Sequence, residues 1–116
     1  MKMYGIPNCD TVKKARAWLD AHSVDYEFHD YKKHGVDAAL LAQWMAKAGW
    51  EKVLNRQGQT WRKLSDAEKA AVKDDTSAIK LLRDKPSAIK RPAIEVKGQL
   101  LLGFDADEYQ KMLGDK

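Results

Sequence analysis

The chain has 116 residues, of which 44% are hydrophobic and 33% are charged. This length and composition are typical of one folded domain and exclude an intrinsically disordered protein. Its 21 Lys and Arg residues against 17 Asp and Glu residues leave a formal charge of +4, dispersed along the sequence. Because nucleic-acid binding needs a concentrated basic patch, we expect a solvated mixed-charge surface and no nucleic-acid partner.

The first apolar stretch is short and is interrupted by Lys2, so it does not have the pattern of a secretory leader. No apolar run approaches the roughly 20 residues that a membrane span needs. Cys9 is the one cysteine of the chain, so an internal disulfide cannot form and an oxidising compartment gains no support. We expect a cytoplasmic protein without a membrane partner, and we take it to be a monomer.

The N-terminal part predicts a strand, a helix and a second strand. Met1 to Ile6 is an apolar run that ends in a Pro-Asn turn, as expected of a buried strand. Apolar residues then recur with helical spacing, and Asp10 or Thr11 is expected to cap that helix. Residues 24–29 alternate apolar and polar side chains, the pattern of a strand with one buried face. Two strands joined by a helix form a βαβ unit, so the two strands should be parallel.

The middle of the chain shows helical patterns and loops but no strand pattern. Residues 40–48 form one apolar helix face, and Gly49 stands where a helix commonly ends. Ser65 to Glu68 has the spacing of a capping box, in which two side chains satisfy each other's free backbone donors. A further helix, residues 77–84, should end near Pro86. We therefore place a helical insert at about residues 36–85 within a single domain of residues 1–116.

The last third returns to strands. Residues 93–96 and 100–102 flank Lys97-Gly98, which predicts an antiparallel hairpin. Asp105 to Glu108 then opens a final helix, again with capping-box spacing. The predicted fold class is therefore α/β, in the order βαβ, helices, ββα.

Cys9 lies where the first turn meets the first helix. A thiol at a helix N-terminus faces unpaired backbone N–H groups and the positive end of the helix dipole, both of which favour thiolate. Thr11 could add a hydroxyl hydrogen bond, and Lys13 or Lys14 a positive charge one turn on, whereas the charge of Asp10 opposes the thiolate. The alternative is a buried structural cysteine, because unpaired cysteine is among the most buried residue types. The polar residues around Cys9 favour the reactive thiolate.

Three other features of the sequence bear on function. Pro92, directly before a predicted strand, indicates a sheet edge, a bend or a cis peptide, and the pattern leaves these open. Trp18 and Trp44 lie at helical spacing among aliphatic residues, which favours the core over a base-stacking platform; Trp61 stays open. The three histidines show no metal-ligand spacing, so no metal site is predicted.

Together these features resemble the ArsC/Spx family of arsenate-reductase-like thioredoxin folds. Pro7-Asn8-Cys9 matches the family's Pro-x-Cys turn, and Pro86 with Arg91-Pro92 matches its Pro-x4-Arg-Pro stretch. Residues 55–64, which precede the capping box, resemble the YffB group within that family. The resemblance implies a thioredoxin-like fold with a mixed four-stranded sheet and a helical insert between its two halves. It also implies that Pro92 is cis and that Arg91 points at Cys9 and binds anionic groups.

The sequence departs from the arsenate reductases and from the Spx regulators of this family. The former surround the thiolate with three arginines and carry His-Asn before the turn. Here Gly5-Ile6 replaces His-Asn, Gly103 stands at the third arginine and Arg56 lies one position from the first. Only Arg91 matches, so an oxyanion would be under-neutralised. Spx regulators typically carry Cys-x-x-Cys, but Val12 occupies the second position here, so an external thiol must resolve any mixed disulfide.

We therefore expect a glutathione-dependent thiol reductase in which Cys9 forms a mixed disulfide that glutathione resolves. No bound cofactor is expected; glutathione is the expected cosubstrate, and a small-molecule or protein disulfide is the other partner. Arg56 and Arg62 could hold carboxylates of glutathione through their guanidinium forks. An Spx-like protein-binding module without enzymatic activity and an arsenate reductase with an incomplete arginine set remain as alternatives. Beside the catalytic Cys9, the expected substrate- or glutathione-binding residues are Asn8, Thr11, Lys13, Arg56, Arg62, Arg91 and Pro92.

Overall fold

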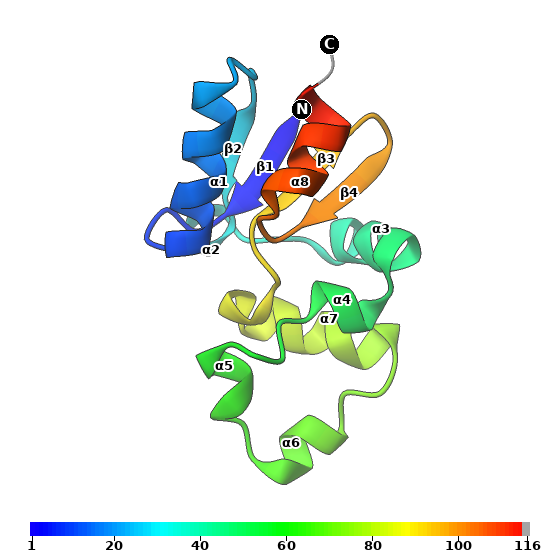
Figure 1. Ribbon diagram of the computed structural model, residues 1–116. Coiled ribbons are helices and arrows are strands. Elements are labelled where there is room, and N and C mark those ends of the chain that lie inside the picture. Colours follow the sequence, from blue (N-terminus) through cyan, green and yellow to red (C-terminus); the bar gives the residue numbers. More distant parts are fainter. Residues whose placement is uncertain (115–116) are drawn as a thin grey trace. The chain divides into compact units, whose positions relative to one another are not determined.

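The computed structural model describes residues 1–114, and the contacts within the chain divide it into two compact units (Figure 1). The first unit combines Met1–Asp30 with the chain from Arg91 onward, and the second is Tyr31–Lys90. The second unit contains the segment in which the sequence places the helical insert. The single domain expected from the chain length stays a prediction.

The elements, in chain order, are β1 (Lys2–Gly5), α1 (Asp10–Ala21), β2 (Glu27–Asp30), α2 (Tyr31–His34), α3 (Ala38–Ala48), α4 (Trp50–Val53), α5 (Gln59–Arg62), α6 (Asp66–Ala70), α7 (Asp75–Asp84), the 3-10 helix η1 (Pro86–Ala88), β3 (Ala93–Val96), β4 (Gln99–Leu102), α8 (Ala106–Tyr109) and the π-helix η2 (Gln110–Gly114).

The first unit is built on a four-stranded sheet with the order β2-β1-β3-β4. β1 pairs with β2 in parallel, as the βαβ pattern predicted, and with β3 in the antiparallel sense. β3 and β4 form the predicted antiparallel hairpin. Its turn residues Lys97 and Gly98 have φ values of 52° and 74°, as two-residue hairpin turns of the primed types require. The mixed sheet confirms the thioredoxin-like α/β fold class.

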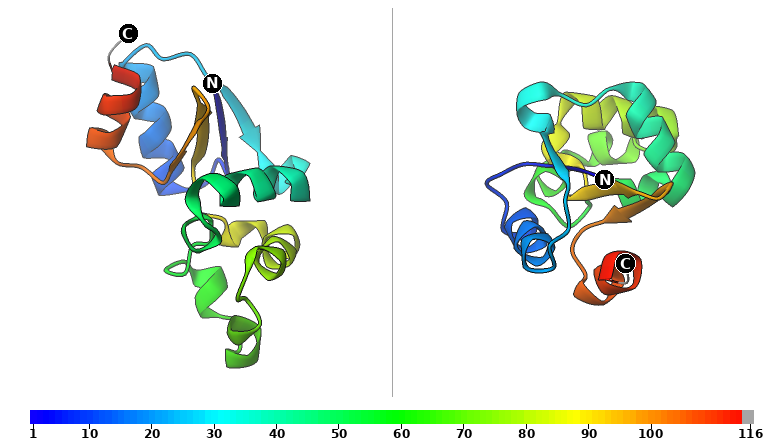
Figure 2. Two further views of the ribbon diagram at one scale, coloured as in Figure 1. Left: turned by 90° about the vertical axis from the view of Figure 1, so that its right-hand side faces the viewer. Right: turned by 90° about the horizontal axis from the view of Figure 1, so that it is seen from above.

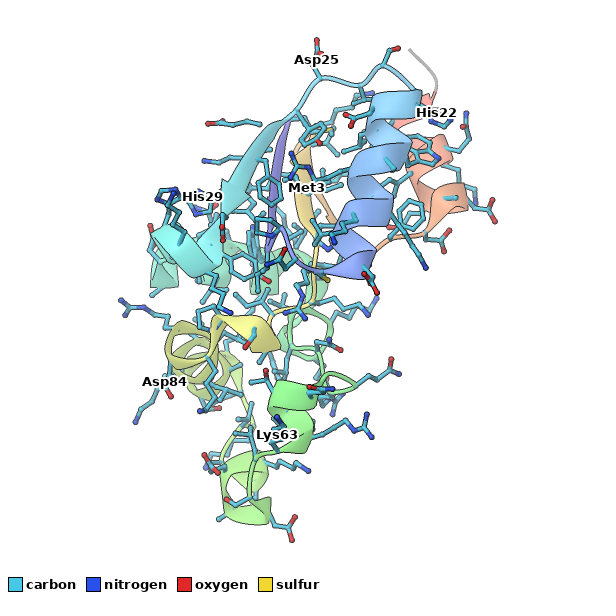
Figure 3. All side chains as sticks on the ribbon, turned by 90° about the vertical axis from the view of Figure 1, so that its left-hand side faces the viewer. Met3, His22, Asp25, His29, Lys63 and Asp84 are labelled. Atoms are coloured by element: carbon cyan, nitrogen blue, oxygen red, sulfur yellow. The ribbon has the colours of Figure 1, made fainter. Side chains whose placement is uncertain are left out.

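Helices α1 and α8 cover the same face of this sheet (Figure 2). Met3 of β1, Ile94 of β3 and Leu101 of β4 bury their side chains there, and Figure 3 shows Met3 between the sheet and α1. The helices contribute the rest of this core through Val12, Ala15, Leu19, Tyr109 and Leu113. Because β1 and α1 both bury side chains in it, the core fixes the turn between them, which carries Cys9.

Two element boundaries differ from the sequence prediction for identifiable reasons. β2 begins at Glu27, because the Val24 N–H still bonds the Leu19 carbonyl at the end of α1, at 2.9 Å. α7 begins at Asp75, because Asp74 and Ser77 form a second capping box that the sequence analysis missed. Ser77 is therefore the third residue of the helix instead of its start.

The second unit is helical, as predicted, and α3 packs against α7. Trp44 of α3 is fully buried, which confirms its core role, and α3 ends at Gly49 with a φ of 89°. A short antiparallel bridge between Leu54 and Ile89 joins the chain after α4 to the chain after η1. Backbone bonds from Lys90 to Val53, at 2.7 Å, and from Asn55 to Ala88, at 2.8 Å, flank it. The bridge holds the two ends of this helical segment together.

The capping box at α6 gives a direct test of local stability. Ser65 Oγ accepts the Glu68 N–H at 3.1 Å, and Glu68 Oε1 accepts the Ser65 N–H at 3.0 Å, as the sequence predicted. We expect Ser65→Ala to lower the free energy of unfolding by about 1 kcal/mol, measured by urea denaturation. Glu68→Gln keeps an oxygen acceptor and should change the midpoint little. Equal midpoints for Ser65→Ala and the wild type would contradict the role of this cap.

Candidate active site

Cys9 is the N-cap residue of α1, at the end of the Pro7-Asn8 turn. Its backbone is extended, with φ −122° and ψ 126°, and its carbonyl accepts the Lys13 N–H at 2.9 Å, the first hydrogen bond of the helix. The prediction that Asp10 or Thr11 caps this helix is therefore wrong, because α1 begins one residue after Cys9. The Cys9 side chain is partly exposed and packs against the edge of the core. The thiol thus lies at the helix start and within reach of solvent.

Gly5 determines how closely β1 approaches the start of α1. A Cβ atom at this position would lie 3.0 Å from Cγ2 of Val12 and 3.6 Å from Cε1 of Phe28. Such a distance to Val12 is closer than side chains normally tolerate. A histidine, which the resemblance to the arsenate reductases would place here, would require Val12 to shift. Contact with Val12 therefore favours glycine over a larger residue at position 5 of this chain.

Arg91 is brought to Cys9 by the pairing of β1 with β3. The two strands are antiparallel, with Tyr4 opposite Ala93, so the end of β1 and the start of β3 lie at the same edge of the sheet. Arg91 and Pro92 directly precede β3, and the turn to Cys9 directly follows β1. Arg91 Nε donates a hydrogen bond to Cys9 Sγ at 3.2 Å. The contact joins residues 82 positions apart, and it confirms that Arg91 points at the cysteine.

The Arg91-Pro92 peptide is cis, which the family resemblance implied and which the residue pattern had left open. Pro92 is buried in the first unit, whereas Arg91 is partly exposed. The guanidinium can therefore contact both the sulfur and a molecule that approaches from solvent. This arrangement of a cysteine and an arginine is the candidate active site.

The surroundings of Cys9 favour its thiolate. Partial burial raises the pKa of the thiol, but the Val12 backbone N–H, the hydrogen bond and the charge of Arg91, and the Thr11 backbone N–H lower it further. The net effect places the pKa of Cys9 below the ordinary value of a cysteine. The Cys9 sulfur does not accept a capping hydrogen bond from the first turn of α1. The backbone N–H groups of that turn therefore favour the thiolate through their partial positive charge. Among residues 1–114, Arg91 is the one side chain that contributes to this lowering.

The remaining predicted residues of the first unit lie around this pair. Asn8 is exposed in the turn, and Thr11 and Lys13 are exposed in the first turn of α1. Thr11 acts on Cys9 through its backbone N–H, and within residues 1–114 its hydroxyl forms no hydrogen bond with the sulfur. Their roles in binding a substrate stay predictions.

Arg56 and Arg62 belong to the helical unit. Arg56 forms an ion pair with Glu51 at 3.6 Å, and both side chains are largely exposed. Arg62 is exposed at the end of α5, where it lines an open depression with Gln59 and Lys63. An exposed ion pair contributes little to the free energy of folding. Arg56 could therefore leave Glu51 and bind another carboxylate at little energetic cost. Their predicted contacts with glutathione stay predictions.

Gly103 and Tyr109, which were not predicted as site residues, support the backbone of the site. Gly103, directly after β4, donates its N–H to the Pro92 carbonyl at 2.9 Å. The Tyr109 hydroxyl donates to the Gly103 carbonyl at 2.8 Å. The one sequence feature that points to this contact is a glycine directly after a strand. A glycine there can indicate a close approach of two backbone segments, but it does not identify which residue Gly103 contacts.

No set of three or more His, Cys, Asp and Glu side chains between residues 1 and 114 is arranged to hold a metal ion. None of the helices in this range combines the length and the apolar character that a membrane crossing needs.

The fold and the site define a thioredoxin-like α/β protein with a cysteine at the start of its first helix. Comparison with known families supports a more specific statement. The model of the ArsC family matches residues 4–112, so the chain belongs to the ArsC family.

Solved structures and curated relatives agree with this placement. A structure described as the YffB protein is 52% identical, covers 97% of each chain and has a TM-score of 0.91. The solution structure of an arsenate reductase (ArsC) related protein from Brucella melitensis is 47% identical, covers 95% of this chain and 91% of that one, and has a TM-score of 0.76. An uncharacterised protein of Haemophilus influenzae is 43% identical over 108 residues, 93% of this chain and 94% of that protein.

The Spx regulators are more distant relatives. The global transcriptional regulator Spx of Streptococcus agalactiae is 29% identical over 110 residues, which cover 92% of this chain and 78% of that protein. The chain is thus similar both to arsenate-reductase-like proteins and to Spx, as its sequence motifs indicated.

Proposed function

We propose that the protein is a glutathione-dependent thiol–disulfide oxidoreductase in which Cys9 is the nucleophile. The observation that carries this proposal is the 3.2 Å hydrogen bond from Arg91 Nε to Cys9 Sγ at the start of α1. It supplies a positive charge and a donor to a sulfur whose pKa is already lowered by backbone N–H groups. Membership of the ArsC family supports a thiol-based reaction.

The reaction proceeds in three exchanges, of which the first two involve Cys9. The Cys9 thiolate attacks one sulfur of a substrate disulfide, a Cys9–substrate disulfide forms, and the other sulfur leaves as a thiolate that takes up a proton. The chain has one cysteine, so the second exchange needs an external thiol. A glutathione thiolate attacks the mixed disulfide at the substrate sulfur, forms a glutathione–substrate disulfide, and releases the Cys9 thiolate. In the third exchange a second glutathione thiolate attacks the glutathione sulfur of that product, forms oxidised glutathione and releases the substrate sulfur as a thiolate, so the substrate gains two electrons in all.

Arg91 would act at two points of this reaction. It stabilises the attacking thiolate in the resting protein and the same thiolate when it leaves in the second exchange. Its partly exposed guanidinium can also bind a carboxylate of the incoming glutathione, because guanidinium and carboxylate match in geometry.

The proposal is tested by incubating the reduced protein with oxidised glutathione and measuring its intact mass. We expect one glutathione per chain, located on Cys9 by peptide mapping and removed by excess reduced glutathione. An unmodified protein whose Cys9 also reacts with iodoacetamide at the rate of an unstructured cysteine would overturn the proposal.

Arsenate reduction is a second candidate, favoured by the 47% identity to the arsenate reductase (ArsC) related protein of Brucella melitensis. Arg91 is the one side chain of the described residues that hydrogen-bonds the sulfur, so the site offers limited positive charge to an oxyanion. Glutathione oxidation that depends on added arsenate would support this candidate. Turnover of disulfides without arsenate turnover would favour the first.

A protein-binding role is the third candidate, favoured by the similarity to Spx over 92% of this chain. Such a role would not depend on the thiol. A stable partner that is captured equally by the wild type and by Cys9→Ser would support it, whereas loss of all measured activity in Cys9→Ser would favour the oxidoreductase.

A further inference from the structure

Tyr109 is the last residue of α8 and is almost completely buried, with 1% of its surface exposed. Burial, followed by the nearby charge of Glu108, raises the pKa of its hydroxyl far above neutral pH. The hydroxyl therefore stays protonated and keeps its one proton for donation. It donates that proton to the Gly103 carbonyl at 2.8 Å.

The ring of Tyr109 is held by two other aromatic residues. It meets the Trp18 ring edge-on, at 5.6 Å between centroids and an angle of 89°, and the Phe104 ring similarly, at 5.0 Å and 85°. Trp18 lies on α1, the helix that begins after Cys9. Edge-to-face pairs have a defined geometry, so these two contacts fix the direction of the hydroxyl.

Gly103 connects this hydroxyl to the backbone beside Cys9. Its φ of 79° lies in the left-handed region, which glycine adopts without strain. Its N–H donates to the Pro92 carbonyl at 2.9 Å, while its own carbonyl accepts from Tyr109. Both polar backbone groups of Gly103 are therefore engaged, one by α8 and one by the residue next to Arg91.

Arg91 directly precedes Pro92, so a shift of the Pro92 backbone is passed on to the backbone of Arg91. As long as the Arg91 side chain keeps its rotamer, such a shift moves Nε and changes its distance from the Cys9 sulfur. The hydrogen bond from Arg91 Nε to Cys9 Sγ is 3.2 Å long, a close contact for a sulfur acceptor, and its strength falls as the two atoms separate. We propose that Tyr109 is a positioning residue of the candidate active site, which acts through Gly103 and Pro92 to hold Arg91 against Cys9.

This inference rests on the proposed function in one respect, that the Cys9 thiolate is the reacting group. Its test measures the thiolate itself and needs no glutathione. Tyr109→Phe keeps the ring and its two aromatic contacts and removes only the hydroxyl. The matched control is Tyr26→Phe, which removes a hydroxyl that accepts a hydrogen bond from Arg16 Nε at 3.0 Å in the same unit.

The experiment follows the ultraviolet absorbance of the thiolate and the rate of alkylation by iodoacetamide across pH. We expect Tyr109→Phe to shift the titration midpoint of Cys9 to higher pH and to slow alkylation near neutral pH about twofold, because the Arg91 hydrogen bond weakens. The shift should disappear in urea. Tyr26→Phe should titrate like the wild type.

A purely structural role of Tyr109 predicts a different result. Tyr109→Phe would then have a lower melting temperature, while its Cys9 would titrate as in the wild type, and this result overturns the inference. An equal shift of the Cys9 titration midpoint in Tyr26→Phe would also overturn the inference. The shift would then result from a general loss of stability and would not depend on the contact between Tyr109 and Gly103. A shift in Tyr109→Phe without any glutathione adduct in the wild type supports the positioning role and contradicts the proposed function alone.

Discussion

Cys9→Ser should abolish the glutathione adduct and lower thiol–disulfide exchange activity by about three orders of magnitude or more. The serine hydroxyl is a poor nucleophile near neutral pH, and the chain contains no second cysteine that could replace the thiol. The substitution is nearly isosteric at a partly exposed N-cap, where serine is also a favoured residue. The protein should therefore fold normally.

The measurement is the rate of glutathione oxidation with a small disulfide as substrate, coupled to intact mass after exposure to oxidised glutathione. Ala17→Ser, on the exposed face of α1 away from the candidate site, is the matched control and should retain wild-type activity. If Cys9→Ser kept an appreciable fraction of the activity, Cys9 would not be the nucleophile.

Arg91→Gln should raise the pKa of Cys9 and slow its alkylation near neutral pH about fivefold. The substitution removes the charge and the Nε donor that favour the thiolate, and leaves the opposing effect of partial burial in place. The smaller thiolate fraction slows alkylation, but this effect is offset in part, because a more basic thiolate reacts faster once it has formed. The titration midpoint therefore reports the change more directly than a single rate.

The pH dependence has a definite sign. Arg91 holds the pKa of Cys9 low, so the wild type keeps its thiolate to lower pH than the variant does. The difference in thiolate fraction should be largest between the two midpoints and should vanish at high pH, where both proteins are fully deprotonated. Arg91→Lys keeps a charge without the guanidinium fork and should fall between the two.

Arg16→Gln is the matched control for Arg91→Gln, because Arg16 lies on α1 and donates to the Tyr26 hydroxyl instead of the thiol. Arg16 also lies over the Phe28 ring at 4.3 Å, so its loss tests whether removal of any arginine from this unit affects Cys9. The same midpoint in the wild type and in Arg91→Gln would contradict the electrostatic role of Arg91.

The comparison of sequence and structure separates local features from tertiary ones. The capping box at Ser65 and Glu68 and the end of α3 at Gly49 were predicted correctly, because each depends on residues within one turn. The first helix was predicted in place, but its cap was assigned to Asp10 or Thr11 instead of Cys9. Propensity favours Asp and Thr at that position, and the strand–turn geometry before the helix overrode it.

The order of the α/β elements and the placement of Cys9 at a helix start could be predicted from hydrophobic period and turn residues, which act over a few positions. The family, and with it the approach of Arg91 to Cys9, was implied by the resemblance of two short motifs and by no residue spacing. The contacts of Tyr109 and Gly103 beside the site became visible in the folded structure alone. The contact between Arg91 and Cys9 exists because β1 pairs with β3 across most of the chain, and strand pairing at such separation leaves no local pattern in the sequence.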